Sequence, residues 1–279
     1  MGTGKTLTTD NVTVGDGTNT GNYAVTYVTS TLGTINQANI TLASEAVTRT
    51  YDATTTANGT ATTISGTLYA GDALSGGTFT FDNKNVGTGK TLTTDNVTVG
   101  DGTNTGNYAV TYVTSTLGTI NQANITLASQ AVTRTYDATT TANGTATTIS
   151  GTLYAGDALS GGTFTSDNKN VGTGKTLTTN NVTVGDGTNT GNYAVTYVTS
   201  TLGTINQANI TLASQAVTRT YNATTNASGT ATTVSGTLYA GDALSGGTFT
   251  FDNKNAGTGK TLTTNDVTVG DGTNTANLS

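Results

Sequence analysis

Short runs of alternating apolar and polar residues follow one another along the chain and predict β-strands. In the run NYAVTY, Tyr108, Val110 and Tyr112 fall on one side of an extended chain, and in GTFTF the same holds for Phe79 and Phe81. A helix would need apolar residues at intervals of three to four positions, together with Leu, Glu, Lys and Ala. Runs rich in Thr, Val, Ile, Tyr and Phe, separated by Gly, Asn and Asp, are typical of strands and turns.

Six or seven strands are expected within one stretch of the chain, because the third run holds one or two strands and is broken or bulged at Gly66. The expected strands are Asn39–Ser44, Ala46–Tyr51, Thr60–Tyr69, Gly77–Phe81, Lys90–Val99 and Asn107–Ile120. The expected turns are Ala70–Asp72, Ser75–Gly77, Asp82–Asn85 and Gly100–Asn107.

The strand pattern recurs along the chain at one fixed period. The run GTGKT begins at Gly2, Gly87, Gly172 and Gly257, which are equally spaced. The segments 35–119 and 120–204 differ at three positions only, where Glu45, Phe81 and Asp95 become Gln130, Ser166 and Asn180. We therefore expect four parts: 1–35, the C-terminal part of a repeat; 36–120 and 121–205, full repeats; and 206–279, a repeat without its last strand.

A repeat as long as the segment 36–120 has the size of a small domain. Strands every 8–12 residues with frequent turns predict an all-β fold of tandem small antiparallel β-sandwich-like domains. The alternative is a parallel β-helix, whose coils repeat every 20–30 residues. No shorter repeat is visible inside one period, so discrete domains are the preferred interpretation.

Apolar residues shared by the copies are the expected core of each domain. Phe81 is placed at the rim or surface, because truncation of a buried Phe to Ser would cost about 3 kcal/mol or more. The expected core residues are Ile40, Leu42, Val47, Tyr51, Ile64, Leu68, Phe79, Leu92, Val97, Val99, Tyr108, Val110 and Leu117.

Composition restricts the chemistry that the chain can carry out. Only 9% of residues are charged, and there is no His, Cys, Pro or Trp. An imidazole base, a thiolate nucleophile and the usual zinc ligands are therefore excluded. The net charge of −6 argues against nucleic acid as a partner, and no run of 18 apolar residues predicts a transmembrane segment. We expect no enzymatic activity and no cofactor.

The run GTGKT resembles the end of a phosphate-binding loop, but its context does not fit. Such a loop needs G-x-x-x-x-G-K-[ST] and opens a helix. Lys84 stands where the first glycine would be, and the residues after Lys90 predict a strand. Nucleotide binding is therefore not expected.

Three polar features are candidate sites. Asp101 and Asn104 lie in a glycine-rich loop of the kind that binds calcium, but calcium needs six to eight oxygens and the loop offers one carboxylate. Asp52 and Asp72 are interpreted as turn residues that bond their own backbone. Lys90 is interpreted as a lysine at the start of an edge strand; the alternative is an isopeptide bond to a neighbouring Asn or Asp, which needs a buried carboxylic acid.

The order of these landmarks resembles the Tyr-Asp-Gly (YDG) repeat domain of filamentous-haemagglutinin-like bacterial adhesins and other large surface exoproteins. The matching positions are Tyr51, Asp52, Gly71, Asp72, Gly87, Gly89, Lys90, Asn107 and Tyr108, and they cover essentially the whole repeat. One departure is Ala53, which replaces the glycine after Tyr-Asp and argues against a need for a positive φ there.

The resemblance implies a secreted or surface-displayed β-domain in a tandem stalk, without catalytic residues. We therefore expect a structural or adhesive segment, outside the cell or on a bacterial surface, that serves as a stalk or joins cells in a biofilm matrix. The alternative is a weak, multivalent carbohydrate- or matrix-binding module, with exposed Tyr and Phe81 as contacts.

The repeat phase also predicts self-association. The segment 22–35 has the sequence of the strand that 206–279 lacks, so it is expected to complete that repeat in another molecule, head to tail. The residues expected to mediate this strand exchange are Tyr23, Val25, Tyr27, Leu32 and Ile35.

Overall fold

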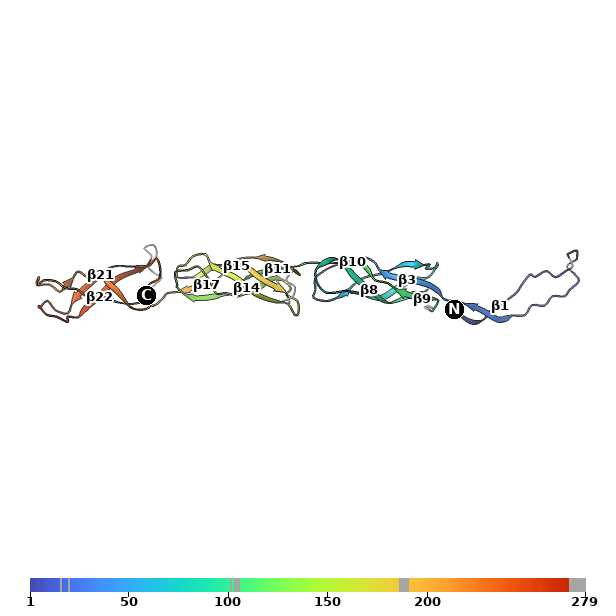
Figure 1. Cartoon of the computed structure of the whole chain (residues 1–279), viewed down its shortest axis with the longest axis horizontal. Coiled ribbons are helices and arrows are strands. Elements are labelled where there is room, and N and C mark those ends of the chain that lie inside the picture. The colour runs from blue at the N-terminus through green and yellow to red at the C-terminus, as the bar shows by residue number, and fades with distance from the viewer. Residues whose placement is uncertain (16, 20, 101, 103–105, 186–190, 271–279) are drawn as a thin grey trace. The chain divides into compact units, whose positions relative to one another are not determined.

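The computed structural model describes the whole chain except residues 16, 20, 101, 103–105, 186–190 and 271–279 (Figure 1). In the described part every regular element is a β-strand, as the all-β prediction requires. The chain divides into two compact units, Met1–Gln122 and Ala123–Ser279. The division into four repeats by residue number stays a prediction.

Two sheets make up the body of the first unit. The smaller sheet has the order β6–β3–β9, and the larger has the order β4–β10–β8–β7–β5. These strands are β3 (Ala38–Ser44), β4 (Val47–Thr50), β5 (Thr56–Ala57), β6 (Ala61–Gly66), β7 (Ala73–Phe81), β8 (Gly87–Gly100), β9 (Tyr108–Tyr112) and β10 (Ser115–Asn121). Each repeat therefore closes on itself as a pair of sheets, unlike a coil of a β-helix.

The first and last segments of this repeat both pass from the smaller sheet to the larger. The chain runs from β3 into β4 and from β9 into β10, and the two segments lie parallel, with Ala38 opposite Tyr108 and Val47 opposite Gly118. The other strand pairs are antiparallel. The single strand expected over residues 107–120 is thus two strands, and the parallel pairing was not expected.

The second repeat has the same order of strands. Its sheets are β13–β11–β16 and β12–β17–β15–β14, with an isolated bridge between Thr141 and Thr165 in the place of β5. Its strands are β11 (Ala123–Ser129), β12 (Val132–Thr135), β13 (Ala146–Gly151), β14 (Ala158–Ser166), β15 (Gly172–Gly185), β16 (Tyr193–Tyr197) and β17 (Ser200–Asn206).

The two partial repeats have smaller sheets. The third repeat has β18 (Thr211–Ser214), β19 (Asn226–Ala227), β20 (Ala231–Ser235), β21 (Ala243–Phe251) and β22 (Leu262–Gly270), in the orders β18–β20 and β19–β21–β22. Near the N-terminus, β1 (Gly2–Leu7) pairs with β2 (Ser30–Ile35). The partners Gly2–Ile35, Lys5–Gly33 and Leu7–Ser30 repeat, one period earlier, the register of β8 and β10.

Most of the expected core is buried, but Leu68 and Val110 are half-buried and two further members are exposed. Ile40, Leu42 and Leu92 are at most 1% exposed, whereas Ile64 and Leu117 are 58% and 57% exposed. The register shifts between β3 and β6 and between Ser115 and Gly118 of β10. A shift of one residue moves a side chain to the opposite face of a sheet, which explains both errors.

The placement of Phe81 at the surface is wrong. Phe81 is 3% exposed, and the Arg49 guanidinium lies over its ring, 5.1 Å from the centroid. Its counterpart Ser166 is also buried. The second repeat therefore accommodates the loss of a buried ring that the sequence argument had treated as too costly to occur.

The turn expected at Ser75–Gly77 lies inside strand β7. Gly76 and Gly77 have φ of 65° and 104°, and Asn96 on the paired strand β8 has φ of 57°. The pairing passes from Gly76–Val97 directly to Thr78–Asp95. The register is the same on both sides, so these residues interrupt the ladder of the hairpin locally and do not reverse the chain.

Candidate functional site

The residues that recur in each repeat gather at the two opposite ends of the domain. One group lies where the chain leaves the repeat. Gly87 pairs with Ile120 near the end of β10, and the Tyr51 amide donates to the Asn121 carbonyl at 2.8 Å. We call this end, with Tyr51, Asp52, Gly87, Gly89 and Lys90, the C-proximal end.

The other group lies where the chain enters the repeat, at the N-proximal end. The Ala38 amide donates to the Asn107 carbonyl at 3.0 Å. The Tyr108 hydroxyl donates to Asp72 Oδ2 at 2.5 Å and accepts from the Tyr69 amide at 3.0 Å. Burial and the hydrogen bond to Asp72 raise the pKa of the Tyr108 phenol. Asp72, expected only to stabilise its own turn, thus binds the last segment of the repeat.

Asp52 shapes the turn at the C-proximal end. Its Oδ1 accepts from the amide and hydroxyl of Thr54, and Arg49 forms an ion pair with it. Burial opposes ionisation of this carboxyl group, but the bonds from Arg49 and Thr54 outweigh it and lower the pKa of Asp52. In the third repeat Asn222 accepts the same bonds from Thr224.

The residue after Asp52 adopts a left-handed conformation, contrary to expectation. Ala53 has φ of 64°, and its counterparts Ala138 and Ala223 have φ of 62° and 63°. Only glycine adopts this region without a steric penalty. The turn therefore still requires the left-handed backbone conformation that glycine adopts easily. Ala53 adopts this conformation at the cost of a steric clash between its Cβ and the backbone.

Lys90 is buried inside strand β8 rather than exposed at an edge. It is 8% exposed, and its Nζ donates to Asn83 Oδ1 at 2.6 Å and lies 3.2 Å from Asp82 Oδ1. Gly118 packs against it, because a Cβ at that position would approach the Lys90 carbonyl to 2.8 Å. The Asp82 side chain is 43% exposed, so the group is an ion pair without the buried acid of an isopeptide site. The run GTGKT thus organises the C-proximal end.

A junction between two repeats is visible within the second unit. The Tyr136 hydroxyl, in the second repeat, donates to Asp242 Oδ1, in the third, at 2.8 Å. The rings of Tyr136 and Tyr239 meet edge to face at 5.7 Å. Tyr136 is fully buried and forms a cluster with Ile205 and Ala208. A residue from the C-proximal end of one repeat therefore fills the N-proximal end of the next.

Comparison with known families agrees with this repeat. The model of the YDG domain matches residues 35–116, 121–201 and 206–278. The chain belongs to the YDG domain family. No curated protein and no solved structure matches the chain. Tyr136 is the tyrosine of the Tyr-Asp pair in the second YDG repeat, which places this family landmark at the junction.

The aspartate at this position of the YDG repeat accepts from different tyrosines in different repeats. In the first and second repeats, Oδ2 of Asp72 and Asp157 accepts from Tyr108 and Tyr193 of the same repeat, at 2.5 and 2.6 Å. In the third repeat Oδ1 of Asp242 accepts from Tyr136, while Oδ2 is buried with no hydrogen-bond partner among the described residues. An unpaired buried oxygen is costly, and Asp242 has one.

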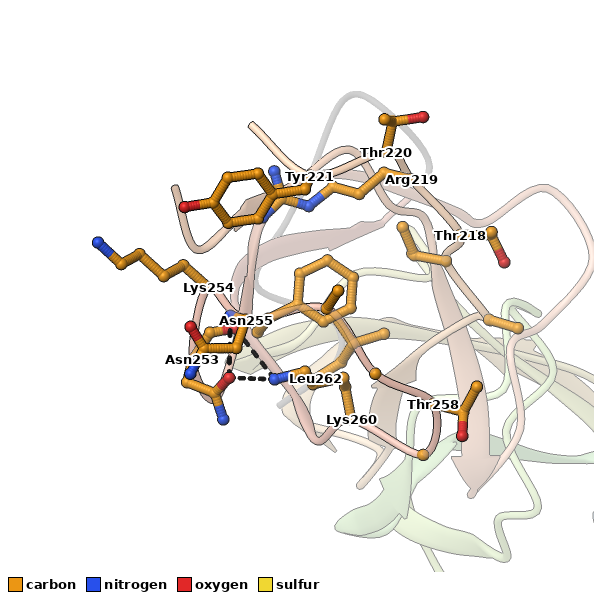
Figure 2. Close-up of a pocket in the computed structure, with 16 residues that line it drawn as sticks. Thr218, Arg219, Thr220, Tyr221, Asn253, Lys254, Asn255, Thr258, Lys260 and Leu262 are labelled. Atoms are coloured by element: carbon orange, nitrogen blue, oxygen red, sulfur yellow. Dashed lines mark hydrogen bonds between the residues drawn. The ribbon is translucent and has the colours of Figure 1, made fainter. Parts of the chain in front are cut away.

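An open groove runs along the third YDG repeat, with a volume of about 420 Å³. Arg219 and Tyr221 lie on one wall, and Lys260 and Leu262 on the other (Figure 2). Lys260 Nζ bonds to Asn253, as Lys90 does to Asn83. These walls correspond to β4 and to the start of β8, which hold β10 between them in the first repeat.

Both walls of the groove lack the strands that the corresponding residues form in the first repeat. Residues 217–220 and 257–261 are irregular, whereas their counterparts Val47–Thr50 and Gly87–Thr91 lie in strands β4 and β8. Tyr221 is 58% exposed, whereas Tyr51 and Tyr136 are fully buried. These backbone segments therefore present hydrogen-bonding groups that a strand between them would pair.

A second cavity, of about 470 Å³, lies at the N-proximal end of the first YDG repeat. Ile35, Ala38, Tyr69 and Asp72 line it. These residues are the counterparts of Ile205, Ala208, Tyr239 and Asp242, which surround Tyr136 at the junction. These four residues are therefore common to the two places, but Met1, Asn107 and Tyr108 also line this cavity, and the Met1 ammonium donates to Asn107 Oδ1 at 2.8 Å.

The residues expected to exchange a strand are exposed near the N-terminus. Their exposed fractions are 63% for Tyr23, 44% for Val25, 40% for Tyr27, 88% for Leu32 and 59% for Ile35. The counterparts of Tyr23 and Ile35 in the first full repeat are at most 5% exposed, but the counterpart of Leu32 is 57% exposed. Leu32 therefore faces outward even in a complete repeat and is a poor contact for strand exchange.

The remaining expectations concern metals and membranes. The calcium candidates Asp101 and Asn104 lie outside the described residues. The part of the chain that is described brings together no cluster of three or more acidic side chains suited to a metal ion. It also contains no apolar helix of the length that crossing a bilayer requires.

Proposed function

We propose that the chain is a structural and adhesive repeat segment of a bacterial cell-surface or secreted filamentous protein, in which the YDG repeats act as a stalk. The observation that supports this proposal is the buried junction in which Tyr136 of one repeat reaches Asp242 of the next. A junction with a buried aromatic ring and a charged hydrogen bond resists bending more than a flexible linker does.

The placement on the outside of a bacterium rests on the resemblance of the landmarks to repeats of filamentous-haemagglutinin-like adhesins. The mechanical role rests on the chain itself. Neighbouring repeats are joined by only a short segment, because β17 ends at Asn206 and Ala208 already belongs to the buried cluster of the junction. With strands of about 20 Å, each repeat contributes a fixed increment of length.

Electron microscopy of variants with different repeat numbers tests this proposal. Residues 121–205 are duplicated once or twice, and the contour length of single particles is measured. The proposal predicts an equal increase in length for each added repeat. A length that stays constant, because added repeats fold back on their neighbours, would contradict a stalk.

The alternative of a carbohydrate- or matrix-binding module has lost one of the contacts that it named, whereas tyrosines such as Tyr69 remain exposed. Phe81 is buried, with Arg49 above its ring, and is not available to stack on a sugar. We therefore prefer the structural and adhesive role to this alternative.

A further inference from the structure

We infer that the tyrosine pairs beside the recurring aspartate are sites of oxidative cross-linking, and that one of these pairs joins two consecutive repeats. The inference goes beyond the stalk role, because it assigns a covalent modification to the junction. The pair at the junction is Tyr136 of the second repeat and Tyr239 of the third, whose rings meet edge to face with centroids 5.7 Å apart. The co-reactant is a small one-electron oxidant of the kind formed from hydrogen peroxide.

The composition of the chain directs oxidation to tyrosine. Cysteine and methionine are the side chains whose sulfur atoms are commonly oxidised first. The chain has no Cys, Trp or His and a single Met, but it has 12 Tyr. The phenol ring is therefore the most readily oxidised group along nearly the whole chain. Without cysteine, no disulfide connects one repeat to the next.

The same pairing of rings occurs inside a complete repeat. The rings of Tyr154 and Tyr193 are stacked with centroids 6.4 Å apart, and the Tyr193 hydroxyl donates to Asp157 Oδ2 at 2.6 Å. Tyr69 and Tyr108 form the equivalent pair in the first repeat. In every case one tyrosine bonds the aspartate, and the other stands three positions before that aspartate in the sequence. The pair is therefore a recurring feature of the repeat.

The bonded carboxylate accepts the proton that oxidation releases. Removal of an electron makes a phenol strongly acidic, and its proton moves along an existing hydrogen bond to a nearby base. For Tyr136 that base is Asp242, whose Oδ1 lies 2.8 Å from the hydroxyl. The transfer leaves a neutral phenoxyl radical on Tyr136 and a neutral carboxylic acid on Asp242. Oxidation therefore leaves no unpaired charge in the buried junction.

The surroundings of the junction pair hold the two rings together and exclude water. Tyr136 is fully buried in a cluster with Ile205, Ala208 and Val269, and Tyr239 packs against this cluster. A radical in such a site is shielded from reductants in solution, and the nearest tyrosine ring is the one that it already contacts. The rings come from two repeats, so coupling fixes the second repeat to the third.

The new bond forms between ring carbons. Tyr239, which is half-buried, loses one electron to the oxidant and its phenolic proton to water. The two phenoxyl radicals combine at carbons ortho to their oxygens, and the hydrogen on each of these carbons then moves as a proton to the phenol oxygen. The pair loses two electrons and two protons in total. One molecule of hydrogen peroxide takes up both and is reduced to two molecules of water.

The cross-link changes how the repeats unfold. It closes a loop between positions 136 and 239, and a covalent link across a long loop lowers the conformational entropy of the unfolded chain, as a disulfide does. It also holds the two rings together when the hydrogen bond between Tyr136 and Asp242 breaks. Oxidation therefore stiffens the junction.

Photo-oxidation followed by peptide mapping tests the inference. The dilute full chain is illuminated with tris-bipyridyl ruthenium and persulfate, which remove one electron at a time, and is then digested with trypsin. Trypsin cleaves after Lys and Arg, so Tyr136 is in peptide 135–169 and Tyr239 is in peptide 220–254. The expected product is these two peptides joined, with dityrosine fluorescence and with the mass of both peptides less two hydrogen atoms.

Phenylalanine variants assign the cross-link to the pair. Tyr136→Phe and Tyr239→Phe should each abolish the joined peptides, because phenylalanine forms no phenoxyl radical. Tyr221→Phe changes the other tyrosine of peptide 220–254 and should leave the yield unchanged. Tyr154→Phe should also leave this product and should remove the separate link between peptides 135–169 and 176–219. Asp242→Asn should lower the yield several-fold, because an amide accepts the proton far less readily than a carboxylate.

Isotope labelling distinguishes the junction from encounters between chains. In an equal mixture of heavy-nitrogen-labelled and unlabelled chains, the joined peptides should be both labelled or both unlabelled. Mixed pairs in statistical proportion, joined peptides that persist in Tyr136→Phe, or no joined peptides from the wild-type chain would each overturn the inference. None of these results bears on the contour lengths that test the stalk.

Discussion

The Tyr136 hydroxyl and the Asp242 carboxylate, 106 positions apart, form a 2.8 Å hydrogen bond that joins two repeats. The corresponding carboxylate of the second repeat, Asp157, bonds Tyr193 of its own last segment. The same aspartate position thus serves two purposes. In the second repeat it holds the repeat closed, and in the third it holds the neighbouring repeat in place.

Replacement of Tyr136 by Phe should loosen this junction. The change leaves Asp242 Oδ1 without its partner, and we expect a loss of about 1–3 kcal/mol in the stability of the third repeat. Hydrogen exchange of β18 and β21, measured alongside urea unfolding, reports the loss. Tyr69→Phe is the control, because Tyr69 is 57% exposed and should tolerate the change. Equal protection in the two variants would contradict the role of the hydroxyl.

Replacement of Ser166 by Phe should stabilise the second repeat. In the first repeat Phe81 occupies the same buried position beneath Arg49, whereas Ser166 leaves Arg134 without a ring. Restoring the buried ring and its cation–π contact should add about 1–3 kcal/mol to the free energy of unfolding. Denaturant unfolding of the full chain measures the gain. The reverse change, Phe81→Ser, should lower the stability of the first repeat by a similar amount. A lower free energy of unfolding for Ser166→Phe would contradict the prediction and would mean that the second repeat has repacked around Ser166 and has no room for the ring.

Replacement of Ala53 by Gly should also stabilise its repeat. Ala53 has φ of 64°, where an L-residue pays about 1–2 kcal/mol. Glycine removes this strain. It also costs about 0.4–1 kcal/mol of stability, because it gives the unfolded chain more conformational entropy. We expect a net gain of about 0.5–1 kcal/mol in thermal unfolding. Gly71→Ala, where φ is 94° and a Cβ meets no atom within 4 Å, should show the opposite sign.

Acid should weaken the first and second repeats through Asp52 and Asp137. Burial of the Asp137 carboxyl opposes ionisation, but bonds from Thr139 and Arg134 lower its pKa, as bonds from Arg49 and Thr54 lower that of Asp52. Groups with lowered pKa values stabilise the folded state above the unfolded pKa of about 3.9, and this contribution is lost as the pH falls through the folded pKa.

The double variant Asp52→Asn, Asp137→Asn should therefore melt at a slightly lower temperature than the wild type at neutral pH and at the same temperature near pH 2. Both carboxylates are more than 40% exposed, so the difference will be small. The third repeat already carries Asn222 and serves as an internal reference. Parallel melting curves for the two chains across the whole pH range would refute the linkage.

The alternating pattern predicted the class of fold because strand side chains alternate between faces. Val97 and Val99 are buried as expected from this rule. The rule failed at Leu117 and Ile64, where register shifts move side chains to the other face. Gly76 and Gly77 were assigned to a turn, because a glycine pair signals a reversal of the chain as readily as the left-handed backbone that both residues adopt inside β7.

The site was harder to predict than the fold. Asp52 was expected to form a turn with its own backbone, and this bond is local in sequence. The bonds from Tyr108 to Asp72 and from Tyr136 to Asp242 span 36 and 106 positions, and no spacing rule connects such residues. The only sign of these hydrogen bonds in the sequence is that a tyrosine and an aspartate recur together in each copy.

The identity of β10, β17 and β2 in sequence has a consequence for folding kinetics. A folding sheet meets several copies of the same closing strand, and side-chain packing does not distinguish between them. The nearest copy along the chain has the highest effective concentration and binds first. Synthesis from the N-terminus also lets each repeat find its own strand before the next copy emerges. After denaturation all copies compete at once, so refolding of the whole chain should be slower and less faithful than its first folding.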